Sequence, residues 1–326
     1  MQRVPSEFDI IQRYFTRTSL GAELGVGDDA ALVKPSAEME LVISTDMLVS
    51  GQHFEADADP RLLGYKSLAV NLSDMAAMGA TPRWATLALA LPEPLVNAGE
   101  GWLKMFAEGF FGLASEHRVD LIGGDTTRGP LNICVTIIGE AAIGKALRRS
   151  GARVGDDIWI SGQLGDAALV IAHTRRQIEL DQGEFLHCLP ALNMPVARVD
   201  LGKRLIGLAH SAIDISDGLM ADLGHILERS KVSATIEMSA IKCSAVMKRH
   251  LPHPSAINCL MAGGDDYELC FTVPSARRGD VESLSGEVGI PLTRIGCIKE
   301  GEGLLVLDES GKSVEMAVRG YDHFRT

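Results

Sequence analysis

Short apolar runs of strand length alternate irregularly with longer stretches of helical periodicity, and this mixture constrains the fold more than any other feature. Residues 41–45, 84–91 and 131–138 are predicted strands, because they are short and apolar, with β-branched side chains in the first and last. Residues 61–78 and 99–116 carry apolar residues at helical spacing and are predicted amphipathic helices. The alternation is too irregular for a doubly wound sheet. We therefore expect an α+β fold with mixed or antiparallel sheets flanked by helices.

A stretch rich in glycine and charge, residues 144–156, separates two halves that each repeat this mixture. In the second half, strands are predicted at 157–161, 233–238, 268–273, 292–298 and 303–307, and helices at 198–209 and 219–229. At 326 residues the chain is long enough for two hydrophobic cores. We predict two domains, residues 1–145 and 146–326.

Charge and cysteine usage narrow the classes of function. With 31 Lys and Arg against 43 Asp and Glu, the net charge of −12 argues against non-specific nucleic-acid binding. No apolar run approaches the roughly 20 residues that span a bilayer, and the start of the chain lacks a signal-peptide pattern. The six cysteines contain no C-x-x-C pair, which argues against a zinc site or a disulfide scaffold; Cys134 and Cys270 are predicted to be buried thiols. We expect a soluble cytoplasmic protein that does not bind membranes.

Aspartates recur beside glycine or hydroxyl residues, often where an apolar run ends. The segments are GVGDD (25–29), STD (44–46), NLSD (71–74), GGDTT (123–127), DISDG (214–218) and GGDD (263–266). Any one of them is most simply a turn, but six in one chain indicate a ligand. Asp74 is the least turn-like, because it lies in a predicted helix among apolar neighbours. Carboxylates and hydroxyls with almost no His or Cys suit a hard cation, and Mg²⁺ bridging to phosphates is the first choice.

Other common motifs are missing or fail in context. The pattern Gly25-x-Gly27-x-x-Ala30 formally matches a dinucleotide-binding loop, but no apolar strand precedes it and its variable positions are two aspartates. The sequence around 311–313 (GKS) lacks the first glycine of a P-loop and is predicted to be a hairpin turn. The absence of a G-x-S-x-G elbow removes the usual signature of serine hydrolases.

Motifs along nearly the whole chain resemble one family. GVGDDAAL, STDMLVSGQHF, YKSLAVNLSDMAAMGATP, LIGGDTTRGP, RSGARVGD, SAIDISDGL, GGDDYEL and the terminal GYDHF are similar, in order, to the motifs of thiamine-monophosphate kinases. That family belongs to a superfamily of ATP-using enzymes that includes aminoimidazole ribonucleotide synthetase and selenophosphate synthetase. The resemblance implies magnesium-dependent transfer of the ATP γ-phosphoryl group to thiamine monophosphate, giving thiamine diphosphate. It also implies a homodimer built through the N-terminal domains, with the active site in a cleft between the two domains.

The resemblance also implies roles for individual residues. The metal ligands would be Asp29, Thr45, Asp46, Asp74, Asp125, Asp214 and Asp217, of which Asp46, Asp125 and Asp217 are assigned catalytic roles. ATP contacts would be Gly124, Asp125, Arg149 and Ser216, and thiamine-phosphate contacts His53, Asp265 and Tyr321. Many family members carry Glu where this chain has Asp265, so this carboxylate is one methylene shorter.

The chemistry agrees with the resemblance. A phosphate monoester has a second pKa of about 6 and is mostly deprotonated at neutral pH, so a direct transfer requires no strong general base. Two alternatives remain at this stage. One is a related ATP-dependent synthetase acting on a purine intermediate or on selenide, although selenide chemistry favours a reactive Cys near the N-terminus and the first cysteine here is Cys134. The other is a metal-binding protein without turnover.

Overall fold

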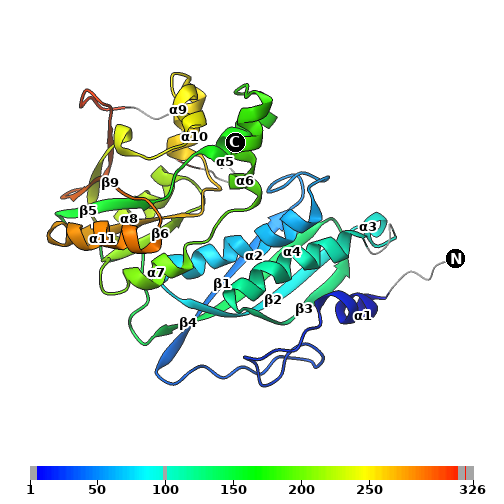
Figure 1. The fold of residues 1–326 in the computed structure, drawn as a ribbon. Helices are drawn as coiled ribbons and strands as arrows, with labels where there is room; N and C mark the ends of the chain where they lie inside the picture. The colour runs from blue at the N-terminus through cyan, green and yellow to red at the C-terminus, as the bar shows by residue number, and fades with distance from the viewer. Residues whose placement is uncertain (1–5, 98–100, 315–319, 321–326) are drawn as a thin grey trace. The chain divides into compact units, whose positions relative to one another are not determined.

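The computed structural model describes residues 6–97, 101–314 and 320 (Figure 1). The chain forms two compact units. The N-terminal unit comprises Met1–Met75 and Ala80–Gly144, and the C-terminal unit comprises Ala76–Gly79 and Lys145–Thr326. The boundary between the two long segments, at Gly144 and Lys145, lies in the stretch rich in glycine and charge.

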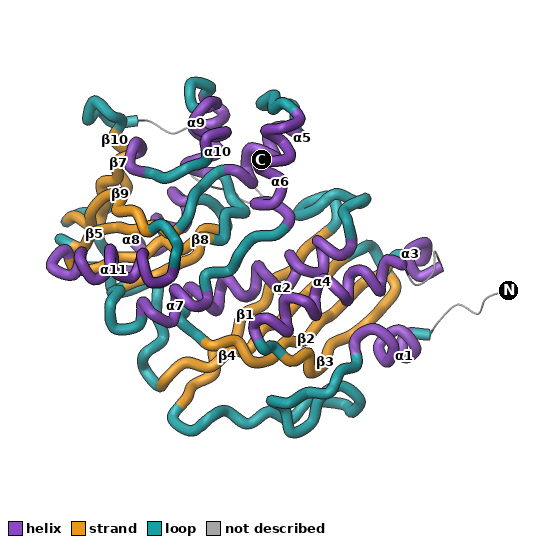
Figure 2. Tube along the Cα trace, in the orientation of Figure 1, coloured by secondary structure: helices purple, strands orange, loops and turns teal. Residues whose placement is uncertain are grey.

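The N-terminal unit is built on a four-stranded mixed sheet with the strand order β1-β4-β2-β3. The strands are β1 (Met39–Val49), β2 (Thr81–Leu91), β3 (Asp120–Arg128) and β4 (Asn132–Ala142). Strand β4 pairs antiparallel with β1 and β2, whereas β2 and β3 are parallel. Helices α2 (Pro60–Ala77) and α4 (Gly101–His117) cover one face of the sheet, as Figure 2 shows. The unit also contains α1 (Glu7–Ile10), the π-helix η1 (Ile11–Phe15) and α3 (Glu93–Asn97).

Helices α2 and α4 approach each other backbone to backbone at two glycines. A Cβ atom on Gly64 would lie 2.0 Å from the carbonyl oxygen of Phe106, and one on Gly109 would lie 1.9 Å from that of Arg61. Such distances are possible only without a side chain. On the same helix α4, Phe106 and Phe110 are fully buried, which confirms that this predicted apolar stripe belongs to the core.

The C-terminal unit contains a six-stranded mixed sheet with the order β10-β7-β9-β5-β8-β6. The strands are β5 (Asp156–Ser161), β6 (Ser211–Ile215), β7 (Ser233–Glu237), β8 (Glu268–Pro274), β9 (Leu292–Lys299) and β10 (Gly303–Leu307). The helices are α5 (Asp166–Thr174), α6 (Gln182–Asn193), α7 (Val199–Leu205), α8 (Leu219–Ser230), α9 (Ala245–His250), α10 (Pro254–Ala262) and α11 (Arg278–Val288), with short 3₁₀ turns η2 (Met238–Ala240) and η3 (Ser275–Arg277). Strand β6 lies at the edge of the sheet, antiparallel to β8.

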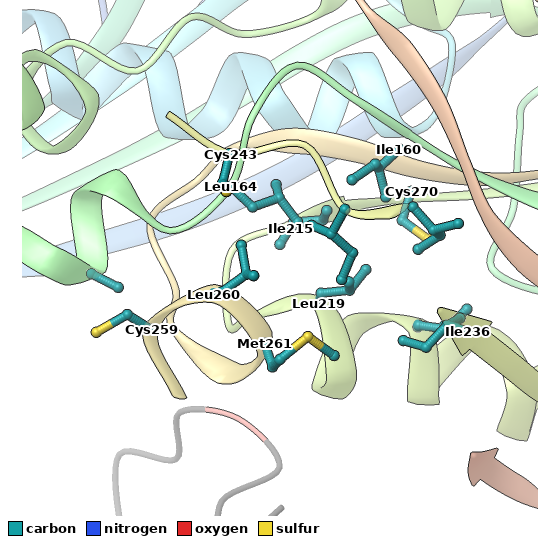
Figure 3. Close-up of a cluster of buried hydrophobic side chains, with 14 of the residues drawn as sticks. Ile160, Leu164, Ile215, Leu219, Ile236, Cys243, Cys259, Leu260, Met261 and Cys270 are labelled. Carbon is teal, nitrogen blue, oxygen red and sulfur yellow. The ribbon is translucent and has the colours of Figure 1, made fainter. Parts of the chain in front are cut away.

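Aliphatic and sulfur-containing side chains from strands and helices form the core of this unit. Figure 3 shows Ile160 and Ile215 from the sheet meeting Leu219 of α8 and Leu260 of α10. Cys270 is fully buried in the same cluster, as predicted. The end of β6, the start of α8 and the end of α10 therefore share one packed core, which fixes the loops that connect them.

The structure confirms the α+β class and the mixed sheets, and it corrects several details. Cys134 is only half-buried, because it lies on the face of the N-terminal sheet that α2 and α4 do not cover. The helix predicted over 198–209 ends at Leu205.

The turn predicted at 311–313 is present, with the Gly311 amide donating to the Asp308 carbonyl. In the part of the chain that the structure describes, no helix combines the length and apolar character needed to cross a bilayer.

Candidate active site

Neighbouring side chains on β1 project to opposite faces of the N-terminal sheet. Thr45 donates to, or accepts from, the Thr136 hydroxyl of β4 at 2.8 Å, whereas Ser44 contacts α2. Because side chains alternate along a strand, Asp46 lies on the face of Ser44, which the helices cover. We call the face of Thr45 the open face. The side chains of Thr45 and Asp46 therefore do not converge on one point.

Asp74 lies over the same face as Asp46. It sits near the end of α2, and its Oδ2 accepts a hydrogen bond from the Ser44 hydroxyl at 2.5 Å. Ser44 and Asp46 are two residues apart on β1, about 7 Å along the strand. The structure thus brings two of the predicted metal ligands, Asp46 and Asp74, to the same part of the helix-covered face.

Asp125 lies on β3, at the other edge of the sheet. The register aligns Asp46, Val135, Leu87 and Gly124 across the four strands, and Asp125 belongs to the next row, opposite Ala88. Three strand spacings separate β1 from β3, about 14 Å. Within this unit one ion therefore cannot contact both Asp46 and Asp125.

Gly124 is required by its own strand pair. Its φ is +148°, and a Cβ atom would lie 1.8 Å from the Leu87 carbonyl oxygen of β2. Any side chain here would separate β2 from β3. The glycine predicted as an ATP contact thus has a structural role, since it lets β3 run close to β2.

His53 and Asp29 occupy loops of the same unit. The Val49 amide donates to Nδ1 of His53 at 3.0 Å. In the neutral ring the proton therefore resides on Nε2, which can donate to an anionic group. Asp29 is exposed in the loop after Gly27, and its own amide donates to the Asp28 carboxylate at 2.9 Å.

In the C-terminal unit, two of the predicted motifs form adjoining loops. The 216–218 loop (Ser216, Asp217 and Gly218) connects β6 to α8, and the 263–266 loop connects α10 to β8. The Asp265 amide donates to the Ser216 carbonyl at 2.9 Å. A Cβ atom on Gly218 would lie 2.6 Å from the carbonyl carbon of Ala262, so the loops also touch at that point.

The Asp265 carboxylate is held in place by its neighbourhood. The Tyr267 hydroxyl donates to Asp265 Oδ1 at 2.8 Å. Both residues have positive φ, 67° for Asp265 and 51° for Tyr267. This conformation is costly for residues other than glycine and is concentrated at functional sites. The strained backbone therefore supports the assignment of Asp265 to a binding site.

Carboxylates crowd around the 216–218 loop. Asp214, near the end of β6, and Asp222, in the first turn of α8, are both buried. Burial, followed by the nearby charges of Asp214 and Asp217, raises the pKa of Asp222 to about 8. The charges of Asp214 and Asp217 thus disfavour ionisation of Asp222, an arrangement that a bound cation relieves.

Asp266 is a second carboxyl group with a perturbed environment. One of its oxygens accepts the Gly165 amide at 2.8 Å, while Oδ2 is buried and has no hydrogen-bond partner among the described residues. The residue as a whole is half-buried, but burial of its carboxyl group, opposed by the Gly165 bond, raises its pKa well above the ordinary value. Glu268, Asp166 and Asp265 raise it further.

Replacing Asp266 with Asn is expected to make the free energy of unfolding depend less on pH and to stabilise the protein near neutral pH. A native pKa above the unfolded value of about 3.9 means that the folded chain keeps a proton that the unfolded chain releases. This contribution to stability is complete below the unfolded pKa and is lost as pH rises toward the native pKa, by up to about 1.4 kcal/mol per pH unit. Urea denaturation of both proteins between about pH 5 and pH 8 measures the difference. Equal slopes would show that Asp266 is ionised in the native state.

Arg149 and Tyr321 are the two remaining predicted residues. Arg149 is exposed, in a segment whose Arg148 carbonyl accepts the Ala212 amide of β6. Tyr321 lies outside the described residues. Gly320, which precedes it, packs against α8 and the loop: a Cβ atom there would lie 2.3 Å from Ala221 Cβ and 3.2 Å from the Asp217 carbonyl oxygen.

The donor chemistry fits magnesium. The predicted ligands are carboxylates and a hydroxyl, the oxygen donors that a hard cation prefers. Burial, followed by the nearby charges of Asp214 and Asp217, raises the pKa of Asp222, so acidic groups are concentrated around this loop. Among the described residues, no three His, Cys, Asp or Glu side chains are gathered closely enough to hold an ion by themselves.

Sequence reasoning missed two residues that shape these loops, Asp222 and Tyr267. Asp222 occupies the same helical face as the buried Leu219, Leu223 and Ile226. An acidic residue at an apolar position of a helix was the signal available in the sequence. Tyr267 gave no comparable signal, because its position beside Asp265 depends on the positive φ of both residues.

Comparison with known proteins places the chain in a class. The model of the AIR synthase related protein N-terminal domain matches residues 27–141, and that of the C-terminal domain matches residues 153–308. The fold and the aspartate-bearing loops are thus those of the AIR synthase related proteins.

Individual relatives narrow the class. The thiamine-monophosphate kinase of Escherichia coli K12 is 44% identical over 325 residues, which cover 98% of each chain. The crystal structure of the thiamine-monophosphate kinase from Stenotrophomonas maltophilia K279a has 45% identity and a TM-score of 0.83, covering 94% of this chain and 95% of that one. AaThiL complexed with AMPPCP and TMP has 31% identity and a TM-score of 0.76, covering 97% and 96%. The chain belongs to the thiamine-monophosphate kinase family. Membership of this family argues against both alternatives, a related synthetase and a metal-binding protein without turnover.

Proposed function

We propose that this protein transfers the γ-phosphoryl group of ATP directly to the phosphate of thiamine monophosphate, with Mg²⁺ as the required cation. The observation that carries the proposal is the pair of hydrogen-bonded loops in the C-terminal unit. The 216–218 loop presents Ser216 and Asp217, the proposed ATP and metal contacts. The 263–266 loop, bonded to it through Asp265 and Ser216, presents the proposed acceptor contact. The relative with AMPPCP and TMP bound supports the same pairing of substrates.

The chemistry required of the protein is mainly electrostatic. A phosphate-monoester oxygen is deprotonated near neutral pH, so the chain need not supply a strong base. Bound Mg²⁺ would neutralise phosphate charge and orient both substrates. We assign its ligands to Asp29, Thr45, Asp46, Asp74, Asp125, Asp214 and Asp217. Of these, Thr45 lies on the open face, where its hydroxyl is bonded to that of Thr136.

The remaining proposed residues bind and orient the substrates. His53, with Nδ1 accepting the Val49 amide, presents Nε2–H as a donor for the acceptor phosphate. Arg149 offers a guanidinium for bidentate binding of the ATP phosphates. Asp265, fixed by Tyr267, and Tyr321, which follows Gly320 at the 216–218 loop, would contact the cationic thiamine portion. Residues of both units thus serve one reaction.

The N-terminal unit has an apolar surface that suits a homodimer. Leu41, Ile43 and Met47 alternate along β1 on the open face and are 39%, 61% and 53% exposed. Exposed apolar side chains in such a row usually mark an interface. We propose that a second copy of the chain covers this face. Sedimentation equilibrium should give about twice the 34.9 kDa chain mass, and Ile43→Asp should shift it toward the monomer; a wild-type monomer at micromolar concentration would contradict the assignment.

The experiment that tests the function is an assay of ADP formation with ATP, Mg²⁺ and thiamine monophosphate. Free thiamine, which lacks the attacking phosphate, should be a very poor acceptor. His53→Ala should raise the KM for thiamine monophosphate by about 10-fold while the KM for ATP changes little, as expected for a lost hydrogen bond to a charged group. Efficient phosphorylation of free thiamine would show that the acceptor is wrong.

A further inference from the structure

Three consecutive backbone amides converge on a single side-chain oxygen in the C-terminal unit. The amides of Ser216, Asp217 and Gly218 donate to Oδ2 of Asp222 at 3.1, 3.0 and 3.1 Å. Asp222 is 3% exposed, so water does not compete for these bonds. Successive amides that point to one place form a concave anion-binding nest. Here the chain's own carboxylate fills it.

This contact fixes the 216–218 loop from one side, and the 263–266 loop fixes it from the other. The amides of the loop point to Asp222, while the Ser216 carbonyl accepts the Asp265 amide at 2.9 Å. Because three amides and one carbonyl of the loop are hydrogen-bonded, its backbone is held in one conformation. This backbone conformation determines where the side chains of Ser216 and Asp217 project.

We propose that Asp222 is a positioning residue for phosphoryl transfer, which holds Ser216 and Asp217 in the orientation that binds ATP and its cation. The inference rests on the proposed function and deepens it. Asp222 contacts neither substrate in this account; it acts through the three amides. A helix cap with only a structural role would stabilise α8 without affecting turnover by the folded protein.

The test compares Asp222→Ala, which removes the acceptor, with Asp222→Asn, which keeps one acceptor oxygen and the size of the side chain. Asp120→Ala is the matched control, because Oδ2 of Asp120 accepts the successive amides of Leu20 and Gly21 at 3.0 and 2.7 Å in the N-terminal unit. We expect Asp222→Ala to lower kcat by about 10²-fold per folded molecule, since small misplacements of reacting groups have effects of that size. Asp222→Asn should recover part of the loss, and Asp120→Ala should keep kcat within about 2-fold.

Amide hydrogen exchange supplies a readout that does not depend on activity. In Asp222→Asn and Asp222→Ala, exchange at residues 216–218 should accelerate by about 10-fold or more, while exchange at Ile226 and Leu227 of α8 changes little. Equal acceleration along all of α8, or wild-type kcat in both Asp222 variants, would overturn the positioning role. If the wild-type protein forms no ADP with thiamine monophosphate, the proposed function fails, and the exchange data still decide whether Asp222 orders the loop.

Discussion

Asp46→Asn and Asp125→Asn are each expected to lower kcat by about 10²-fold or more, the size of effect seen when a key electrostatic group is removed from an active site. Both substitutions keep the shape of the side chain and remove only its charge. Asp46 lies on the helix-covered face near the bond between Ser44 and Asp74, and Asp125 lies on β3, paired with Ala88 of β2. Since the two sites are about 14 Å apart, each variant should weaken a different ion.

Titration of Mg²⁺ in the kinetic assay measures the loss, and circular dichroism shows whether the fold survives. Glu40→Gln is the control on the same strand, because Glu40 accepts the Gly144 amide at 3.0 Å near the other end of β1. Chelation of Mg²⁺ should abolish activity in the wild-type protein and leave its spectrum unchanged. Near-wild-type turnover of both aspartate variants at limiting Mg²⁺ would contradict the assignment of Asp46 and Asp125 as metal ligands.

Gly109→Ala is expected to lower the free energy of unfolding by about 2 kcal/mol or more. Alanine favours a helix by about 1 kcal/mol over glycine, but here the added Cβ would lie 1.9 Å from the Arg61 carbonyl oxygen and 3.0 Å from the Tyr65 amide nitrogen. The helices α2 and α4 must separate to accept it, and overpacking of this kind costs about 1–3 kcal/mol or more. The clash outweighs the propensity, since neither contact is with a flexible side chain.

Gly112, one turn further along α4, is the matched control. Nothing lies within 4 Å of a Cβ atom at this position, so Gly112→Ala should stabilise the protein by up to about 1 kcal/mol. Urea denaturation of the two variants against the wild type compares the same chemical change with and without a neighbour. Equal effects of the two substitutions would show that the close crossing of α2 and α4 does not exist in solution.

Local pattern was enough to predict most elements with strong periodicity. The strands at 84–91 and 131–138 and the helix at 219–229 were predicted within a few residues of β2, β4 and α8, because one face of each is apolar. Strand β3 was not, since its sequence DLIGGDTTR offers glycine and polar residues where a strand usually has apolar ones. It is a strand because β2 pairs with it, and that contact is absent from local sequence.

The candidate site shows the same division. The positions of the aspartate-bearing loops were predictable from the residue types, but the faces to which their side chains project were not. Thr45 and Asp46 are neighbours in sequence and lie on opposite faces of the sheet. Asp222 is an unexceptional helical aspartate in the sequence, and its role emerges only when three amides turn toward it.

The close approach of α2 and α4 at their glycines means that a small rotation of α2 about this contact produces a larger displacement at its far end. Gly64 is the fulcrum, and Asp74 lies ten residues along the same rigid helix, about 15 Å away. Rotation of α2 by 1° about that point would carry the Asp74 carboxylate about 0.3 Å, more than the roughly 0.2 Å within which metal–ligand distances are defined. The position of Asp74, a proposed metal ligand, thus depends on the point where two backbones touch. A bulkier residue at Gly64 or Gly109 should weaken the proposed cation binding before it unfolds the chain.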